Sequence, residues 1–319
     1  VVVMVSFARG KVYQPGQQGV FHCWNRCVRR ARLLGKDPLT NKDYSHRRRW
    51  WVIRLEQLAG LFAIDVEFRA ELSNHFHLML RTSPRIPKRW GTEEVARRWL
   101  TITRLAKSRV DSLPEPSQEQ IEALARDKQE IKRIRRCLSN ISSFVAMLCE
   151  NIARRSNEED GCRGRFFEER FKCRECTDTS EILVCGMYID LNQVRAGEAK
   201  SLATSLNTSL YLRIQAQAQG RRSKNRVDGW MGELTRRPES LEDETLSLRS
   251  RTGRRASDLG ILPMKLVDYR KLLEWTARQI RSGTRKTIPK DLDAILELMS
   301  IQGEEWLAEV EDYATRSVA

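Results

Sequence analysis

Residues 73–80 read SNHFHLML, and this short run places His75 and His77 one residue apart among apolar side chains. The whole chain has only four histidines. Side chains along a β-strand alternate between its two faces, and two residues advance by about 6.6 Å, so both imidazoles would leave the same face. Two imidazoles held in this way can bind one metal ion. The alternative is two surface histidines on a solvated sheet face.

A helical pattern over residues 179–196 brings further reactive groups together. Tyr188, Asn192 and Arg195 fall on one side of such a helix because residues four and seven apart align. Asn192 can offer a carbonyl oxygen to a metal, and Tyr188 offers a phenol whose ordinary pKa is about 10. A tyrosine half-buried at a helix–sheet seam would have the same spacing. The apolar positions that would pack down are Leu183, Met187, Leu191 and Val194.

The histidine pair needs a strand beneath it, and the flanking residues predict a hairpin over 64–82. In IDVEFRAEL, apolar and charged residues alternate, which indicates a half-buried strand. Ser73 and Asn74 suit a tight turn. The apolar face of the first strand would carry Ile64, Val66, Phe68, Ala70 and Leu72. On the returning strand, Phe76, Leu78 and Leu80 would face the core, and His75, His77, Met79 and Arg81 would share the other face.

The remaining elements complete an α+β pattern. The order strand, helix, strand, strand, helix, strand, helix predicts a ferredoxin-like or RRM-like antiparallel sheet with helices on one face and an added tyrosine-bearing helix. The other expected elements are a first strand at 19–28, a helix from Asp43 or Ser45 to about Gly60, a helix at about 140–156 and a fourth strand, GRFFEERFK, at 164–172.

We expect a catalytic domain over residues 1–212 with a proline-punctuated helical insert at about 84–140. Residues 213–258 are polar and predict a linker. Residues 259–319 predict a helical C-terminal extension to which the sequence assigns no chemistry.

Charge indicates the class of partner. Lys and Arg number 57 against 42 Asp and Glu, a net charge of +15. Such an excess favours polyanions, nucleic acid first and an anionic membrane surface second. No stretch approaches the roughly 20 apolar residues of a membrane span, and the apolar start is too short for a signal peptide. Eight cysteines without a secretory signal indicate reduced thiols. We therefore expect a cytoplasmic, nucleoid-associated protein with no membrane partner.

Several basic residues are candidates for DNA contact. The run HRRRWW at 46–51 sets arginines beside tryptophans, a combination that suits phosphates and stacked bases. The alternative is a helix with one charged and one apolar face. The phosphate-contact candidates are Arg47, Arg48, Arg49, Arg165, Arg170, Lys172 and Arg195. Cys173 and Cys176 form a C-x-x-C pair, but no second pair exists to complete a structural zinc site.

Two motifs together resemble a known family. NHFHLML, followed about a hundred residues later by YIDLNQVRAG, is similar to the HUH single-tyrosine transposases and most similar to the REP-associated tyrosine transposases. That group ends its tyrosine helix in a Y-x-x-x-N-P-x-R-A-G run. HCWNR and GRFFEERFK also resemble the family, and the resemblance covers roughly residues 15–200. Gln193 stands where the family has proline, and it should alter the local backbone more than the chemistry.

The resemblance implies a mechanism. His75, His77 and Asn192 would hold one divalent ion, Mg²⁺ or Mn²⁺, that polarises a DNA phosphate. Tyr188 would attack that phosphate and form a 5′-phosphotyrosine. The implied substrate is single-stranded or hairpin DNA.

Two other functions stay open on the sequence. One is a nucleic-acid-binding protein that keeps the fold without the chemistry. The other is a rolling-circle replication initiator or relaxase, which shares the histidine pair and the tyrosine nucleophile, although the N-x-V-R-A-G run argues against it.

Overall fold

A computed structural model describes residues 13–14, 16–107, 115–220, 225–236, 250–282 and 287–318. The elements used below, in chain order, are β1 (Gly19–Arg26), α2 (His46–Leu61), β2 (Ile64–Glu71), β3 (His75–Thr82), α3 (Ile86–Arg89), α4 (Thr92–Lys107), α5 (Gln118–Arg126), α6 (Lys128–Cys137), α7 (Ile141–Glu159), β4 (Lys172–Cys176), α8 (Thr179–Arg195), α9 (Ser209–Ala218), β5 (Glu233–Thr235), β6 (Gly260–Leu262), α12 (Leu266–Ser282), α13 (Lys290–Glu297) and α14 (Trp306–Val318).

The central sheet has the strand order β2-β3-β1-β4, and every neighbouring pair is antiparallel. This is the order of the ferredoxin-like arrangement, so the predicted fold class is confirmed. Strand β3 lies between β2 and β1, which holds the histidine-bearing strand in the middle of the sheet.

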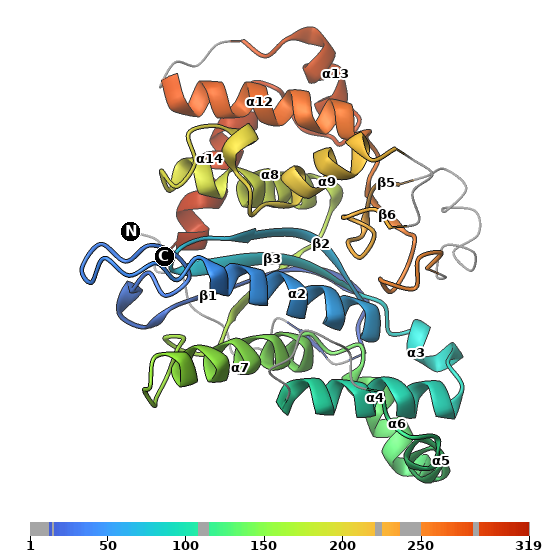
Figure 1. The fold of residues 1–319 in the computed structure, drawn as a ribbon. Coiled ribbons are helices and arrows are strands. Elements are labelled where there is room, and N and C mark those ends of the chain that lie inside the picture. The colour runs from blue at the N-terminus through green and yellow to red at the C-terminus, as the bar shows by residue number, and fades with distance from the viewer. Residues whose placement is uncertain are drawn as a thin grey trace.

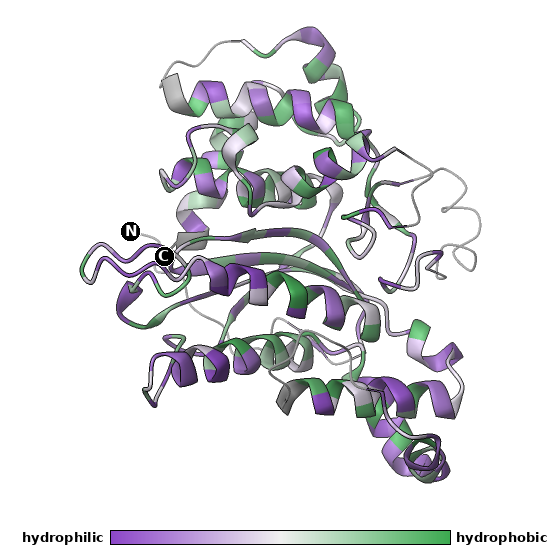
Figure 2. Cartoon of the chain, viewed as in Figure 1, coloured by the Kyte–Doolittle hydropathy of each residue, from purple (hydrophilic) through white to green (hydrophobic). Residues whose placement is uncertain are grey.

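Helices cover both faces of the sheet (Figure 1). On one face, α2, α7 and the insert helices α4 to α6 share a core with Phe76, Leu78 and Leu80 of β3. On the other face, α8 packs on Met79 and is itself covered by α12 and α14. Figure 2 shows the apolar residues along the strands and along the helices beside them. The C-terminal extension is helical, as predicted, and it forms the outer layer over the tyrosine helix.

Strand β2 departs from its predicted alternation. The ladder with β3 shifts register between Val66 and Phe68, so one extra residue stands in β2. Ile64 and Val66 therefore pack toward α2, whereas Phe68 and Ala70 pack toward α8. The prediction that these apolar side chains share one face is wrong, and the strand is buried along its whole length rather than half-buried.

The charged residues of β2 lie in the interior rather than in solvent. Arg81 of β3 contacts Asp65 at 3.3 Å and Glu67 at 2.9 Å. Both carboxylates are fully buried. The Ser257 hydroxyl donates to Asp65 at 2.6 Å, so the segment before β6 closes over this ion cluster. Burying charge is tolerated only when each charge has partners, as here.

The fourth strand lies later than predicted. Strand β4 begins at Lys172, where the predicted strand ends. Phe166, Phe167 and Phe171 are instead buried in the core on the α2 side. A strand alternates its faces, so the adjacent Phe166 and Phe167 could not both reach this core from a regular strand.

The predicted linker is packed in its described parts. Residues 213–218 continue α9, Trp230 and Met231 are buried in the core on the α2 side, and β5 pairs with β6 in parallel. Residues 221–224 and 237–249 lie outside the described residues, as do 1–12 at the start of the chain. None of the described helices is both long and apolar enough to span a membrane.

Glu67 gives the fold a testable pH dependence. Burial raises the pKa of Glu67 to about 7, although nearby Arg81 acts to lower it. A carboxyl that holds its proton more tightly in the folded state stabilises the fold at low pH, and this contribution is lost as pH rises from about 4.5 to 7. The loss should be about 3 kcal/mol.

In Glu67→Gln, urea unfolding at pH 5 and at pH 8 should therefore differ less than in the wild type. The substitution Glu122→Gln on the surface of α5 is the control and should leave the wild-type difference intact. An unchanged pH profile in Glu67→Gln would contradict the assignment.

Candidate active site

Strand β3 and helix α8 bring the candidate catalytic residues together. The Tyr188 hydroxyl lies 3.5 Å from Nε2 of His77, and their ring centroids are 5.2 Å apart. The rings of His75 and His77 are 5.1 Å apart and nearly perpendicular. Asn192, one helical turn beyond Tyr188, lies beside both His75 and Tyr188, and its buried side-chain nitrogen has no hydrogen-bond partner. All four predicted residues thus form one cluster at the seam between helix and sheet.

Local features hold this seam together. Phe76, between the two histidines, points to the opposite face and packs on Trp51 with ring centroids 4.3 Å apart. Helix α8 is capped by the Asp178 side chain, which accepts from the Glu181 amide, and it ends before Gly197 with φ of 70°. Gly186 lets α8 approach the sheet, because a Cβ there would lie 2.8 Å from the Phe68 ring.

The predicted departure at Gln193 has a structural role. Its side-chain amide donates to the carbonyl of Glu71 at 2.9 Å, and its oxygen accepts from the Asn207 amide at 3.4 Å. A proline could make neither contact. Gln193 therefore ties the end of α8 to the end of β2 without touching the candidate reactive groups.

Burial controls the protonation of the cluster. It lowers the pKa of His75 to about 4, with Arg26 adding to the effect, and it lowers the pKa of His77 well below its ordinary value. Both imidazoles are therefore neutral near pH 7, the form that accepts a proton or binds a metal. Burial also raises the pKa of Tyr188 to about 12, so its phenol keeps its proton unless a neighbouring group removes it.

The donor set limits what metal site is possible. Within the described residues, no three His, Cys, Asp or Glu side chains are grouped to hold a metal ion. A metal here would need the Asn192 amide oxygen as its third protein ligand beside His75 and His77. Two neutral imidazoles and one oxygen are a chemically suitable donor set for a divalent ion.

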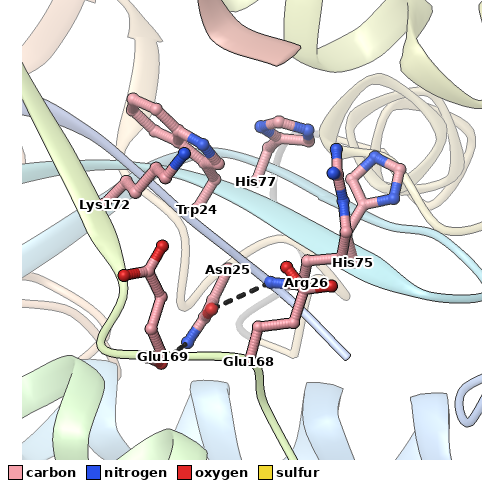
Figure 3. A pocket seen from close by; sticks show the side chains of 8 residues that line it. All are labelled: Trp24, Asn25, Arg26, His75, His77, Glu168, Glu169 and Lys172. Atoms are coloured by element: carbon pink, nitrogen blue, oxygen red, sulfur yellow. Dashed lines mark hydrogen bonds between the residues drawn. The ribbon is translucent and has the colours of Figure 1, made fainter. Parts of the chain in front are cut away.

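A cavity opens beside the two histidines (Figure 3). Arg26 and Lys172 provide positive charge at its wall, and the Asn25 amide is fixed there by donating to the carbonyl of Glu169 at 3.0 Å. Its lining residues are Trp24, Asn25, Arg26, His75, His77, Glu168, Glu169 and Lys172. Arg26 was not predicted as a site residue, although the strand period of HCWNR places His22, Trp24 and Arg26 on one face.

His22 and Tyr313 extend the cluster on the Nδ1 side of His77. His22 is fully buried, and its Nε2 lies 2.9 Å from Nδ1 of His77. Tyr313 of α14 places its hydroxyl 3.0 Å from Nδ1 of His22. Tyr313 was not predicted, and no local signal could have found it, because its spacing within α14 is that of an ordinary core residue.

The predicted phosphate contacts fall into three groups, which are buried and paired, at the cavity wall, or exposed. Arg47 is fully buried and pairs with Glu159 at 2.6 Å and Asp160 at 2.5 Å, so the prediction that it contacts DNA is wrong. Arg48 is mostly buried and pairs with Glu198 at 2.7 Å. Lys172 lines the cavity. Those with exposed side chains, for which DNA contact stays a prediction, are Arg49, Arg165, Arg170 and Arg195.

Comparison with known proteins leaves the family open. No protein-family model matches the chain, and no curated protein does. One solved structure to which the chain is similar is described as a REP-associated tyrosine transposase bound to a REP hairpin. The two share 15% sequence identity with a TM-score of 0.36, over 74% of this chain and 96% of that one. A likeness of this size carries no argument about function, which must come from the residues of this chain.

The two arginines Arg47 and Arg49 should behave differently when substituted. Arg47→Met should lower the free energy of unfolding by about 2–3 kcal/mol, because it leaves two carboxylates without their buried partner. Arg49→Met removes the same charge from an exposed position and should change stability by less than about 0.5 kcal/mol. Urea unfolding of both variants measures the contrast, and equal stability would contradict the structural role of Arg47.

Proposed function

We propose that the chain is a DNA strand transferase in which Tyr188 is the nucleophile and His75, His77 and Asn192 hold a divalent metal ion, Mn²⁺ or Mg²⁺. The observation that carries the proposal is the cluster itself. A tyrosine hydroxyl stands 3.5 Å from a nitrogen of His77, and the Asn192 amide one turn away lies beside both the tyrosine and His75. A nucleophile and a metal-ligand set that share neighbours are the parts that phosphoryl transfer requires.

The chemistry follows from these groups. The bound ion would act as a Lewis acid on the scissile phosphate. Tyr188 gives its proton to solvent and its oxygen attacks phosphorus. The phosphorus keeps its bond to the 5′ oxygen and loses its bond to the 3′ oxygen, which leaves and takes up a proton from solvent. The products are a 5′-phosphotyrosine and a free 3′-OH. Because one phosphodiester replaces another, a 3′-OH can reverse the step and join strands without a nucleotide cofactor.

DNA is the substrate that the charges support. Arg26 and Lys172 stand at the cavity beside the histidines, together with Glu168 and Glu169, and the two cations can contact a phosphate backbone. The net charge of +15 adds a general attraction for polyanions. The motif resemblance supplies the more specific expectation of single-stranded or hairpin DNA.

One observation favours a second candidate, a DNA-binding protein without catalysis. Tyr188 is only 2% exposed, so a phosphate must displace neighbouring side chains before it meets the hydroxyl. A binding protein of this fold would retard DNA on native gels and form no covalent adduct.

Covalent trapping tests the nucleophile. The full chain is incubated with a pool of labelled hairpin oligonucleotides and Mn²⁺ or Mg²⁺, then run on denaturing gels. We expect a labelled protein band that is absent in Tyr188→Phe and in EDTA, because each removes one required part of the reaction. Tyr211→Phe on α9 is the control and should keep the band. DNA retardation with no band across the pool and both metals would favour the binding protein.

Metal binding tests the ligand set separately. Asn192→Ala should weaken Mn²⁺ binding by about 10-fold or more, since it removes one of three protein ligands, whereas Asn192→Asp supplies a charged oxygen and should retain binding. The electron paramagnetic resonance signal of free Mn²⁺ measures the affinity of each variant. Equal affinity in the wild type and Asn192→Ala would remove Asn192 from the ligand set.

A further inference from the structure

Four aromatic side chains form a hydrogen-bonded row that runs from the C-terminal extension to the candidate nucleophile. The row connects Tyr313 to His22 at 3.0 Å, His22 to His77 at 2.9 Å and His77 to Tyr188 at 3.5 Å. Each histidine uses both ring nitrogens, so the position of one proton determines the position of the next. Such a row can exist in two states, which differ only in the direction in which its hydrogen bonds are donated.

We propose that Tyr313 is a positioning residue that acts through His22 to keep Nε2 of His77, the nitrogen facing Tyr188, free of its proton. This inference rests on the proposed function in one respect, namely that the free Nε2 of His77 is used to bind the metal ion. The state of the row itself does not depend on any metal.

The proton positions in the required state can be followed along the row. His77 carries its proton on Nδ1 and donates it to Nε2 of His22. His22 then carries its own proton on Nδ1 and donates it to the Tyr313 oxygen. The Cys185 thiol on α8 lies beside Tyr313, and its sulfur can accept the hydroxyl proton of Tyr313 in this state. In the opposite state, Tyr313 donates to His22, His22 donates to His77, and the proton of His77 occupies Nε2.

Without the Tyr313 hydroxyl the opposite state should dominate. Nδ1 of His22 would have no partner in a fully buried place. A buried N–H without an acceptor is less tolerated than a buried lone pair without a donor. His22 would therefore keep its proton on Nε2 and donate it to His77, which places the His77 proton on the nitrogen that the site needs. Ring packing alone cannot prevent this change.

The C-terminal extension holds Tyr313 in place. Tyr313 is 5% exposed, and the Arg174 guanidinium lies over its ring at 5.0 Å. The Trp306 indole of α14 donates to the Thr276 hydroxyl of α12 at 2.8 Å, which fixes one end of the helix. Second partners of this kind orient the metal-binding histidines of many proteins, and their loss usually weakens metal affinity by about 10–100-fold.

The first measurement is the tautomer of His77 in the metal-free full chain. With ¹⁵N-labelled histidine, long-range proton–nitrogen spectra report which ring nitrogen carries hydrogen, and four histidines are few enough to assign by substitution. We expect the proton on Nδ1 in the wild type and on Nε2 in Tyr313→Phe. Tyr269→Phe is the matched control, because this buried tyrosine of α12 donates to Asp190 at 2.8 Å and does not touch the row.

The second measurement is Mn²⁺ affinity in the same variants. Tyr313→Phe should weaken binding about 10-fold, and Tyr269→Phe should not. In a His22→Gln background the glutamine oxygen can accept from His77 unaided, so adding Tyr313→Phe should change the affinity little. Thermal unfolding confirms that each variant is folded, and His22→Gln provides a second variant if Tyr313→Phe is not.

The outcomes separate the two proposals. If His77 keeps the same tautomer in the wild type and Tyr313→Phe, or already carries its proton on Nε2 in the wild type, the role of Tyr313 is overturned. If the tautomer changes as expected but the wild type binds no Mn²⁺, the metal-dependent function fails and the role of Tyr313 in setting the tautomer stands.

Discussion

The packing of helix α8 on the β3 face of the sheet is the constraint on which the whole site depends. His75 and His77 belong to the sheet, whereas Tyr188 and Asn192 belong to the helix, so the cluster exists only while the two surfaces stay in contact. Gly186 allows the close approach, and Gln193 fixes the helix end to β2. Burial at this seam also removes water from the imidazoles, which is why they are neutral. Packing and protonation at this site thus have one cause.

The same burial explains why this sheet carries charge inside. A ferredoxin-like sheet with helices on one face would leave Asp65 and Glu67 in solvent, where they need no partner. Here the segments around β5 and β6 close the second face, and Arg81 becomes necessary to balance the carboxylates. Arg81, the partner of both carboxylates, lies on β3 itself, four residues beyond His77. Charge pairing and the candidate site therefore share one strand.

Local periodicity was enough to predict the central part of this structure. A period of two located the hairpin and the face that carries His75 and His77, and a period of 3.6 located Tyr188 and Asn192 on their helix. The extra residue near Glu67 could not be predicted, because an alternating pattern continues across a bulge unchanged. Arg47 was assigned to DNA because its sequence neighbours are basic, yet its partners lie 112 and 113 residues away. Contacts of that range leave no trace in a local pattern.

Tyr313 and His22 form a contact between residues 291 positions apart in the sequence, so it is even further beyond the reach of a local pattern. Residues 259–319 were expected to add helices without chemistry. The described part of that extension instead covers α8, whose residues 182–193 are all buried, so removing it would expose the apolar back of the tyrosine helix. Helix α14, which helps to bury α8, is also the element that brings Tyr313 into contact with His22. The extension thus belongs to the core and to the candidate site through the same helix, α14.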